Sequence, residues 1–221
     1  MQFPQPTYHA LISRTNFQLQ NMRTSGGLSK IALFILLCAA ADVACLKLKA
    51  KLDIVRSHNS YRAGVKPEAA NMLNMTWYEP ASRTAQSWAS KCKRLTHDDS
   101  SNRVDSKFGN CGQNIFISSA PMGWQAAVKA WYSEVSKFTF GSADNKFEEI
   151  GHYTQVVWAQ THKVGCGLAK CTDAKGIFFN YICNYCPAGN IVGQINTPYI
   201  KGTKCSGCPN SCLPNGLCAK K

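Results

Sequence analysis

The cysteines constrain this chain more than any other feature. Twelve are present: Cys38 and Cys45 lie in or beside an apolar stretch near the N-terminus, and ten follow between residues 92 and 218. An even number of cysteines in an exported chain indicates a framework of disulfides, whereas the same residues in a cytosolic chain would indicate free thiols or a metal site. The first question is therefore whether the chain is exported.

Residues 22–45 have the order of a secretory signal peptide. Arg23 and Lys30 precede the apolar run 31–41, and small residues follow it. This run is shorter than the about 20 apolar residues that a membrane-spanning helix needs, so a membrane anchor is the weaker alternative. We expect a secreted, extracellular protein whose ten remaining cysteines form disulfides.

The predicted signal peptide begins at residue 22 and not at the first methionine. A signal peptide starts close to its methionine, so residues 1–21 are predicted to be a non-native N-terminal extension ahead of a natural start at Met22. Cleavage after Ala41 or after Cys45 satisfies the preference for small residues, and both sites stay open.

The chain is strongly basic, with a formal net charge of +13, of which the part from Leu46 onward carries +11. Such a surface attracts polyanions. Because nucleic acid is not the expected partner outside a cell, the candidates are sulfated glycans, anionic lipid or an acidic receptor surface. The alternative is a basic secreted protein with no dedicated site for a polyanion.

Residues 50–64 are predicted to form an amphipathic helix. Ile54, His58 and Tyr61 recur at i, i+4 and i+7, which places all three on the inward face. A histidine on such a face is expected to be a hydrogen-bonded core residue.

Two further helices are predicted. Residues 79–94 carry Pro80 in a first-turn position and space their small and apolar residues for one buried face, and His97 follows them. In residues 125–138 the inward face includes Glu134. An unpaired buried charge is expensive, so Glu134 needs a partner.

The segments "VGCGLAKC" and "GIFFNYIC" read as two strands joined by a turn. If Ala174 and Lys175 form the tip, Cys166 lies opposite Cys183, and a disulfide across the hairpin follows. Helices and strands are intermixed rather than strictly alternating, which favours an α+β domain or a layered α/β/α domain.

The last part of the chain is too small to have a core of its own. Residues 193–204 read as a linker, and the four cysteines that follow must hold the end of the chain together through disulfides. Metal binding by Cys205-x-x-Cys208 is the weaker alternative in an oxidising compartment. The sequon Asn74-Met75-Thr76 predicts glycosylation at Asn74, with partial burial nearby.

Four segments together resemble the cysteine-rich secretory proteins of the CAP superfamily. "GHYTQVVWAQT" and "YICNYCPAGNIV" are similar to the two signatures of that family, and "HNSYR" and "GTKCSGCPNSCLPNGLC" agree with them. The resemblance implies a three-layer α/β/α CAP sandwich over residues 46–199 and a small disulfide-rich hinge over residues 200–221. It also implies five disulfides: Cys92–Cys171, Cys111–Cys186, Cys166–Cys183, Cys205–Cys212 and Cys208–Cys218.

Full-length members of the family continue into a second cysteine-rich module that is associated with ion-channel regulation. This sequence stops at Lys221, so we expect the channel-regulatory module to be absent. The chain resembles two-domain members of the family, which include an egg-jelly protein that attracts sperm.

The resemblance implies a cleft with two histidines and two acids. His97, Glu134 and His152 match three of these positions, and Gln113, in "CGQN", stands where relatives commonly carry glutamate. His97, His152 and Glu134 are the candidate metal ligands, and Zn²⁺ is the candidate ion, although no cofactor is expected to be required. The competing interpretation is a hydrogen-bonded polar cluster that stiffens the cleft, since a carboxamide is a poor zinc ligand.

Catalysis is not expected. Neither GxSxG nor HExxH is present, and a hydrolase needs an activated nucleophile or a metal-bound water beside a base. We expect an extracellular signalling or recognition protein that acts on a cell-surface receptor or the sperm surface. The alternatives are a lipid or sterol carrier, a venom-like or defence effector and, weakest, a metal-dependent hydrolase.

Overall fold

The computed structural model describes residues 47–220. The predicted extension 1–21 and signal peptide 22–45 lie outside the described residues. In the described part of the chain, no helix combines the length and the apolar character that crossing a membrane requires.

A four-stranded mixed sheet forms the centre of the domain, in the order β1-β5-β6-β4. β1 (Thr76–Trp77) pairs in parallel with β5 (Lys163–Asp173), while β6 (Gly176–Cys186) pairs antiparallel with both β5 and β4 (Gly112–Ser118). A second, two-stranded sheet joins β2 (Val104–Asp105) to β3 (Gly109–Asn110).

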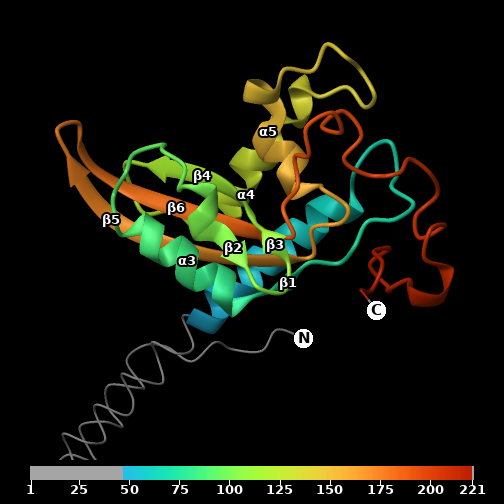
Figure 1. Cartoon of the computed structure of the whole chain (residues 1–221), viewed down its shortest axis with the longest axis horizontal. Helices are drawn as coiled ribbons and strands as arrows, with labels where there is room; N and C mark the ends of the chain where they lie inside the picture. The colour runs from blue at the N-terminus through green and yellow to red at the C-terminus, as the bar shows by residue number, and fades with distance from the viewer. Residues whose placement is uncertain (1–46, 221) are drawn as a thin grey trace, which may run out of the picture. The chain divides into compact units, whose positions relative to one another are not determined.

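Helices cover both faces of the central sheet (Figure 1). α3 (Glu79–Ala89) packs on one face, where Ala85 and Ala89 meet Ile115 and Ile182. The helix over residues 47–63, α4 (Trp124–Ser133) and α5 (Phe147–Val156) supply the other face. The predicted three-layer α/β/α arrangement is confirmed.

Short 3-10 segments complete the secondary structure: η1 (Ser100–Arg103), η2 (Glu134–Lys137) and η3 (Pro209–Ser211). The predicted helices over 79–94 and 125–138 are both present but shorter. The first gives way to turns after Ala89, and the second changes to the tighter η2 at Glu134. A sequence pattern predicts whether a segment is helical more reliably than it predicts the residues at which the helix begins and ends.

The β5–β6 hairpin has the predicted register. Cys166 lies opposite Cys183, and Asp173 pairs with Gly176, which leaves Ala174 and Lys175 as the tip. Because side chains alternate along a strand, β6 places Tyr181, Cys183 and Tyr185 among the apolar side chains under α4 and α5. Cys166 and Cys183 are joined by a disulfide, and the other four predicted disulfides are also present.

The hinge is fastened to the domain by backbone hydrogen bonds. The Cys218 amide donates to the Met72 carbonyl (2.8 Å), and the Asn74 amide donates to the Cys218 carbonyl (2.8 Å). The Gly207 amide donates to the Ala70 carbonyl (2.9 Å) in the same way. Residues 193–204, predicted to be a linker, are likewise tied down, since the Ala159 amide donates to the carbonyl of Pro198 (2.8 Å).

Two glycines of β5 allow α3 to lie directly on the sheet. A methyl group on Gly167 would overlap the backbone of Ala85 and Gln86, and one on Gly165 would overlap the backbone of Tyr78 and Ser82. Helix backbone and strand backbone are thus in contact at both positions, with no room for a side chain.

Gly167→Ala is therefore expected to lower the free energy of unfolding by about 3 kcal/mol, at the upper end of the usual cost of overpacking, because backbone cannot move aside as a side chain can. Urea denaturation of the oxidised protein would measure the change. Gly64→Ala is the control, since a methyl group there meets the Ser60 carbonyl only at an ordinary 3.4 Å. Equal stabilities of the two variants would contradict the close packing of α3 on β5.

Candidate functional site

The structure brings the four predicted cleft residues together as two pairs. His97 lies in the loop after α3 and Gln113 on β4, with 3.0 Å between His97 Nδ1 and Gln113 Oε1. Glu134 lies at the end of α4 and His152 on α5, with 2.7 Å between His152 Nδ1 and Glu134 Oε1.

Glu134 has the partner that its inward position requires. Its carboxylate accepts hydrogen bonds from His152 Nδ1 and from the backbone amides of His152 (2.9 Å) and Tyr153 (3.0 Å). Since a carboxylate only accepts, Nδ1 of His152 carries a proton in this pair, and Nε2 is the ring nitrogen that remains for a further partner. The carboxylate thus fixes both the orientation and the tautomer of His152.

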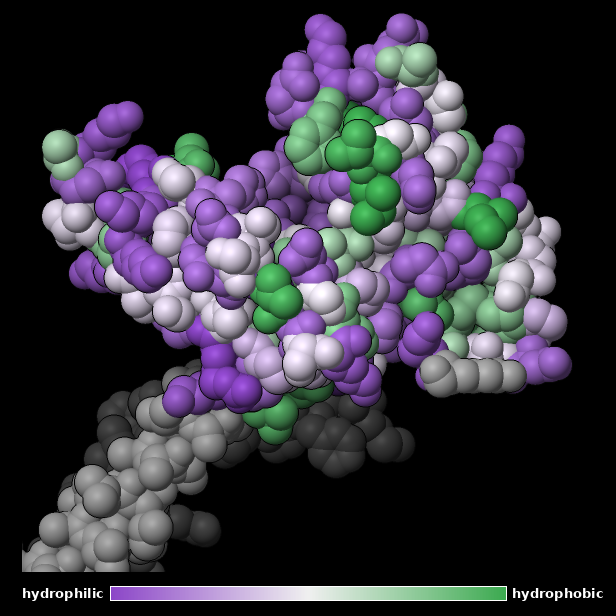
Figure 2. Space-filling model, viewed as in Figure 1, coloured by the Kyte–Doolittle hydropathy of each residue, from purple (hydrophilic) through white to green (hydrophobic). Residues whose placement is uncertain are grey.

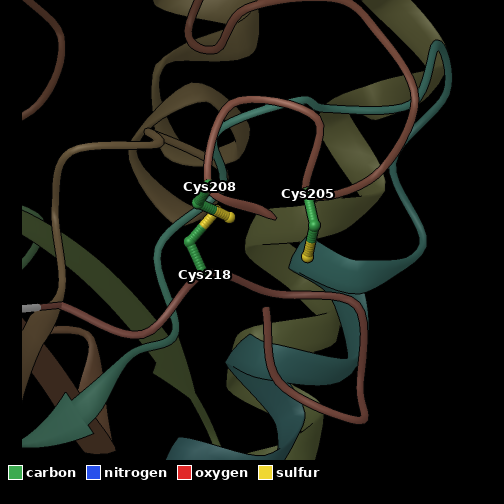
Figure 3. A group of neighbouring side chains, drawn as sticks. All are labelled: Cys205, Cys208 and Cys218. Atoms are coloured by element: carbon green, nitrogen blue, oxygen red, sulfur yellow. A yellow bond between two sulfur atoms is a disulfide. The ribbon is translucent and has the colours of Figure 1, made fainter. Parts of the chain in front are cut away.

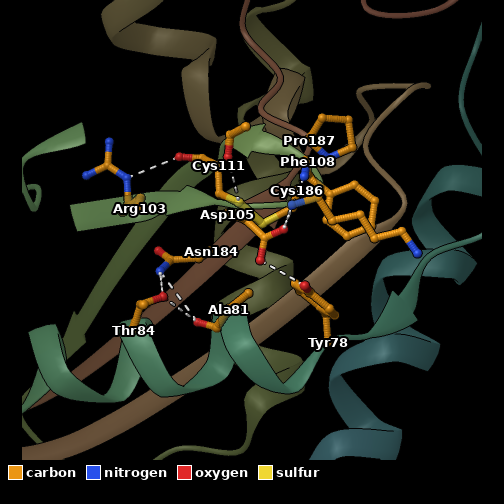
Figure 4. Close-up of a disulfide and its surroundings, with 12 residues drawn as sticks. Tyr78, Ala81, Thr84, Arg103, Asp105, Phe108, Cys111, Asn184, Cys186 and Pro187 are labelled. Atoms are coloured by element: carbon orange, nitrogen blue, oxygen red, sulfur yellow. Dashed lines mark hydrogen bonds between the residues drawn. A yellow bond between two sulfur atoms is a disulfide. The ribbon is translucent and has the colours of Figure 1, made fainter. Parts of the chain in front are cut away.

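Gln113 is buried, and both the oxygen and the nitrogen of its side-chain amide form hydrogen bonds. Its Oε1 accepts from the Asp98 amide (3.1 Å) as well as from His97, and its Nε2 donates to Asn184 Oδ1 (3.0 Å). Asn184 in turn donates to Thr84 Oγ1 (2.9 Å) on α3, as Figure 4 shows. A glutamate at position 113 would have no proton for Asn184, so this chain fits glutamine here.

The environment of His97 favours the neutral ring. Partial removal of the ring from water lowers its pKa, the hydrogen bond to Gln113 opposes that shift, and the positive charge of Arg103 adds to it. Because Gln113 Oε1 accepts the Nδ1 proton, Nε2 of His97 is the nitrogen with a free lone pair. Each histidine of the cleft therefore offers Nε2.

These residues fit a weak metal site rather than a full ligand set. In residues 47–220, only one group of three potential ligands has its donor atoms within 4.8 Å of one another, and it consists of Cys205, Cys208 and Cys218 (Figure 3). All three are in disulfides and have no thiolate to offer, so the alternative of a hinge metal site is wrong. Among the described residues, His97, Glu134 and His152 do not form such a group, so the cleft offers a divalent cation separate imidazole nitrogens, with Glu134 and Gln113 orienting the rings, rather than one closed ligand set.

A second polar network, which the sequence analysis missed, connects the cleft to the core. The predicted core histidine, His58, is fully buried and donates from Nδ1 to the Ile54 carbonyl (2.8 Å), so its Nε2 accepts from Tyr185 Oη (2.9 Å). Asn114 donates to Tyr185 Oη (3.4 Å) and to the His152 carbonyl (3.1 Å). The sequence marked His58 as a hydrogen-bonded core residue, but it did not indicate Tyr185 or Asn114 as partners.

The described residues offer little for nucleophilic catalysis. All ten cysteines from residue 92 onward are in disulfides, and the Glu134 carboxylate is engaged by three donors. A general base needs a free lone pair that is aimed at its substrate. His97 and His152 are each bonded through Nδ1, so their Nε2 atoms are the remaining candidate bases, and the expected lack of catalysis stays a prediction.

The predicted glycosylation site lies where the hinge meets the domain. Asn74 is half-buried, its Nδ2 donates to the Met75 carbonyl (3.2 Å), and its Oδ1 accepts from Asn215 of the hinge (3.0 Å). A glycan on Nδ2 would compete with the bond to Met75. Glycosylation of Asn74 stays a prediction.

A cavity of about 460 Å³ opens beside the start of the hinge. Its lining mixes apolar residues with polar ones, among them Phe140, Trp158, Tyr199, Asn71, Gln194 and Lys201. The lipid-carrier alternative expects an apolar groove. This mixed lining gives no preference for an apolar ligand over a polar one.

Comparison with known proteins agrees with the fold. The family described as "CAP: Cysteine-rich secretory protein family" matches residues 55–185. The chain is 43% identical over 173 residues to cysteine-rich secretory protein 2 of Homo sapiens, covering 78% of this chain and 70% of that protein. It is 42% identical over 179 residues to cysteine-rich secretory protein 3 of Equus caballus, covering 80% and 72% respectively.

Solved structures give the same result. The crystal structure of NaASP2 with Zn²⁺ is 31% identical to this chain, with a TM-score of 0.65 over 76% of this chain and 94% of that one. BmVAL-1 is 27% identical, with a TM-score of 0.65 over 78% and 94%. On the family match, the identities and the shared architecture, the chain belongs to the cysteine-rich secretory protein family of the CAP superfamily.

Proposed function

We propose that this protein is a secreted recognition protein that binds a cell surface, with sperm as the target cell, and that it acts without catalysis. The observation that carries the proposal is the rigid joining of hinge and domain. Two disulfides close the hinge on itself, and backbone hydrogen bonds fasten it to residues 68–74. A surface fixed in advance loses little conformational entropy when a partner binds it.

Export is the first step of this proposal. Five disulfides in one small body are typical of proteins that fold in an oxidising compartment, and the named relatives are secretory proteins. The sperm target rests on the resemblance to two-domain family members, and the binding and swimming assays below test it.

The test uses the full chain produced by a secreting cell line. Sequencing the N-terminus of the protein in the medium locates the cleavage site, and the purified protein is then assayed for binding to sperm and for directed swimming. The control is the double variant Cys205→Ser/Cys212→Ser, which opens one hinge loop and is expected to bind more weakly. A folded, secreted protein that neither binds sperm nor directs their swimming would contradict the proposal.

We further propose that the cleft binds Zn²⁺ weakly through Nε2 of His97 and of His152. The support is the pair of oriented rings with free Nε2 atoms, together with the zinc-containing structure of the related NaASP2. Glu134 and Gln113 would hold the rings in place and tune their basicity, while water would complete the coordination shell.

Gln113→Glu is expected to strengthen zinc binding by about tenfold, the lower end of the effect of a carboxylate partner on a metal-binding histidine, while His152→Ala abolishes it. Isothermal titration with zinc chloride measures both. The same Gln113→Glu change should lower stability, because it removes the proton donated to Asn184. His162→Gln, outside the cleft, is the control, and undiminished zinc binding by His152→Ala would place the site elsewhere.

A further inference from the structure

The loop after α3 and the tip of the β5–β6 hairpin form a basic surface, here called the end patch: Lys91, Lys93, Arg94 and Lys175. Two links between the loop and the hairpin hold the patch together. A disulfide joins Cys92 to Cys171, with 5.5 Å between their Cα atoms, and Arg94 pairs with Asp173 at 2.7 Å. The Lys175 amide donates to the same aspartate (2.8 Å), so the hairpin tip lies beside the loop.

Three of the four cations of the end patch are not neutralised by any described residue, whereas Arg94 is paired with Asp173. Asp173 is the one acid among them, and its pKa is lowered, first by the hydrogen bond from Arg94 and further by the charges of Arg94 and Lys175. Lys91, Lys93 and Lys175 are exposed and form no ion pair with any residue between 47 and 220. Figure 2 shows that the surface over the end of α3 and the hairpin tip is mainly hydrophilic.

Two cations of the patch rest on aromatic rings. Lys91 Nζ lies 4.9 Å from the ring centre of Trp88, and the Arg94 guanidinium lies 4.0 Å from that of Phe178. Arg94 is also held by two hydrogen bonds to Asp173, at 2.7 and 3.0 Å. Side chains that are already ordered lose less entropy on binding an anion than free lysines do.

One further cation lies on α3. Arg83 and Lys91, which follows the end of the helix, are both exposed and are eight residues apart, which corresponds to about 12 Å at the helical rise per residue. Separated cations of this kind match the spaced sulfate groups of a linear polyanion.

Apolar side chains that could enter a membrane are not grouped on this face. Leu95, which is 62% exposed, is the one large apolar residue in the loop. Ile177 is also exposed, but Phe178 contacts Arg94, and alternation along β6 therefore directs Ile177 to the opposite face of the sheet.

We propose that the end patch, extended by Arg83, binds a sulfated glycan chain of the cell surface or its matrix. Sulfate groups spaced along such a chain complement the separated cations, and the preordered Lys91 and Arg94 side chains supply the directed contacts. The inference deepens the proposed extracellular role and rests on it. The partner class is a sulfated glycan. The surface is the end patch, which lies far from the hinge (Figure 1).

The test compares two variants of the full secreted chain that lose the same charge. Lys91→Gln/Lys93→Gln removes two cations from the end patch, and Lys201→Gln/Lys204→Gln removes two from the hinge. Binding to immobilised heparin at physiological salt is expected to weaken by about fivefold in the first variant, from the usual strength of two exposed ion pairs, and by less than about twofold in the second. Desulfated heparin should not bind either protein.

Three results would overturn the proposal. The first is equal weakening in both variants, which would mean that only net charge matters. The second is binding to phosphatidylserine vesicles but not to heparin, which would identify a lipid surface. The third is the absence of heparin binding by a protein that still binds sperm, and this result would leave the proposed function intact. Melting temperatures of the variants confirm that the surface changes leave the fold unaltered.

Discussion

Replacing Arg62 with methionine is expected to lower the free energy of unfolding by more than about 5 kcal/mol, because several buried carbonyl groups would lose their hydrogen-bond donors at once. Arg62 is only 1% exposed and has no carboxylate partner in the hydrogen bonds that it makes. Its guanidinium instead donates to five backbone carbonyls: those of Leu73, Val156, Trp158, Ala159 and Thr161.

This arginine joins three separate parts of the fold. It lies on the helix over residues 47–63, and its acceptors lie in the segment before β1, at the last residue of α5 and in the turn that follows α5. Burial lowers the pKa of Arg62 to about 9, which still leaves the guanidinium charged at neutral pH. The bonds are thus charge-assisted and among the stronger ones a protein makes.

Denaturation in guanidinium chloride, with the disulfides intact, measures the effect. Arg62→Lys keeps the charge but not the planar fork, so an intermediate loss is expected, and it provides a value if the methionine variant does not fold. Arg56→Met, on the exposed side of the same helix, is the matched control and should change stability by less than about 0.5 kcal/mol. A methionine variant within about 1 kcal/mol of the parent would refute this role of Arg62.

Arg62 also shows why part of this structure could not be predicted. Nothing in "HNSYRAG" predicts what the arginine binds, because its acceptors are backbone carbonyls, four of them more than 90 positions away, which leave no mark in the sequence. His58 could be predicted, since its burial follows from the helical spacing of its own apolar neighbours. The sequence shows the helical spacing of neighbouring apolar residues, but it does not show which distant carbonyl groups a side chain will bind.

The disulfides also differ in whether local sequence patterns could predict their pairing. Cys166 and Cys183 face each other across one hairpin, so turn position and strand register were enough to pair them. Cys92–Cys171 and Cys111–Cys186 close loops between distant elements, and only the family resemblance paired them. The hinge was read as a separate appendage because backbone hydrogen bonds to residues 68–74 depend on tertiary position.

The candidate site was predicted as a set of residues but not as an arrangement. The sequence marked His97, Gln113, Glu134 and His152, and the need of Glu134 for a partner followed from its inward position. That His152 is this partner, and that Asn184 accepts the Gln113 proton, required the coordinates. The substitution of an acid by Gln113 was visible in the sequence, but the reason it fits was not.

Acid is expected to destabilise the protein through His58, by about 3 kcal/mol between pH 6.5 and pH 4, which follows from the size of its pKa shift. Burial lowers the pKa of His58 from 6.5 to about 4, the hydrogen bond to the Ile54 carbonyl opposes this shift, and the charge of Arg62 adds to it. Below pH 6.5 the unfolded chain therefore binds a proton that the folded chain does not. The free energy of unfolding falls as the pH decreases through this range and is unaffected by His58 above it.

The matched variant is His58→Gln, whose side-chain amide can still donate to one neighbour and accept from the other but does not titrate. At neutral pH it should be less stable than the parent, and urea denaturation at pH 7.5, 5.5 and 4.5 should show a shallower pH dependence. His97 and His162 also have pKa values lowered by burial and change stability in the same direction, but both remain in parent and variant and cancel in the difference. Parallel pH curves for the two proteins would mean that His58 titrates normally in the folded state, which its full burial against Ile54 and Tyr185 does not allow.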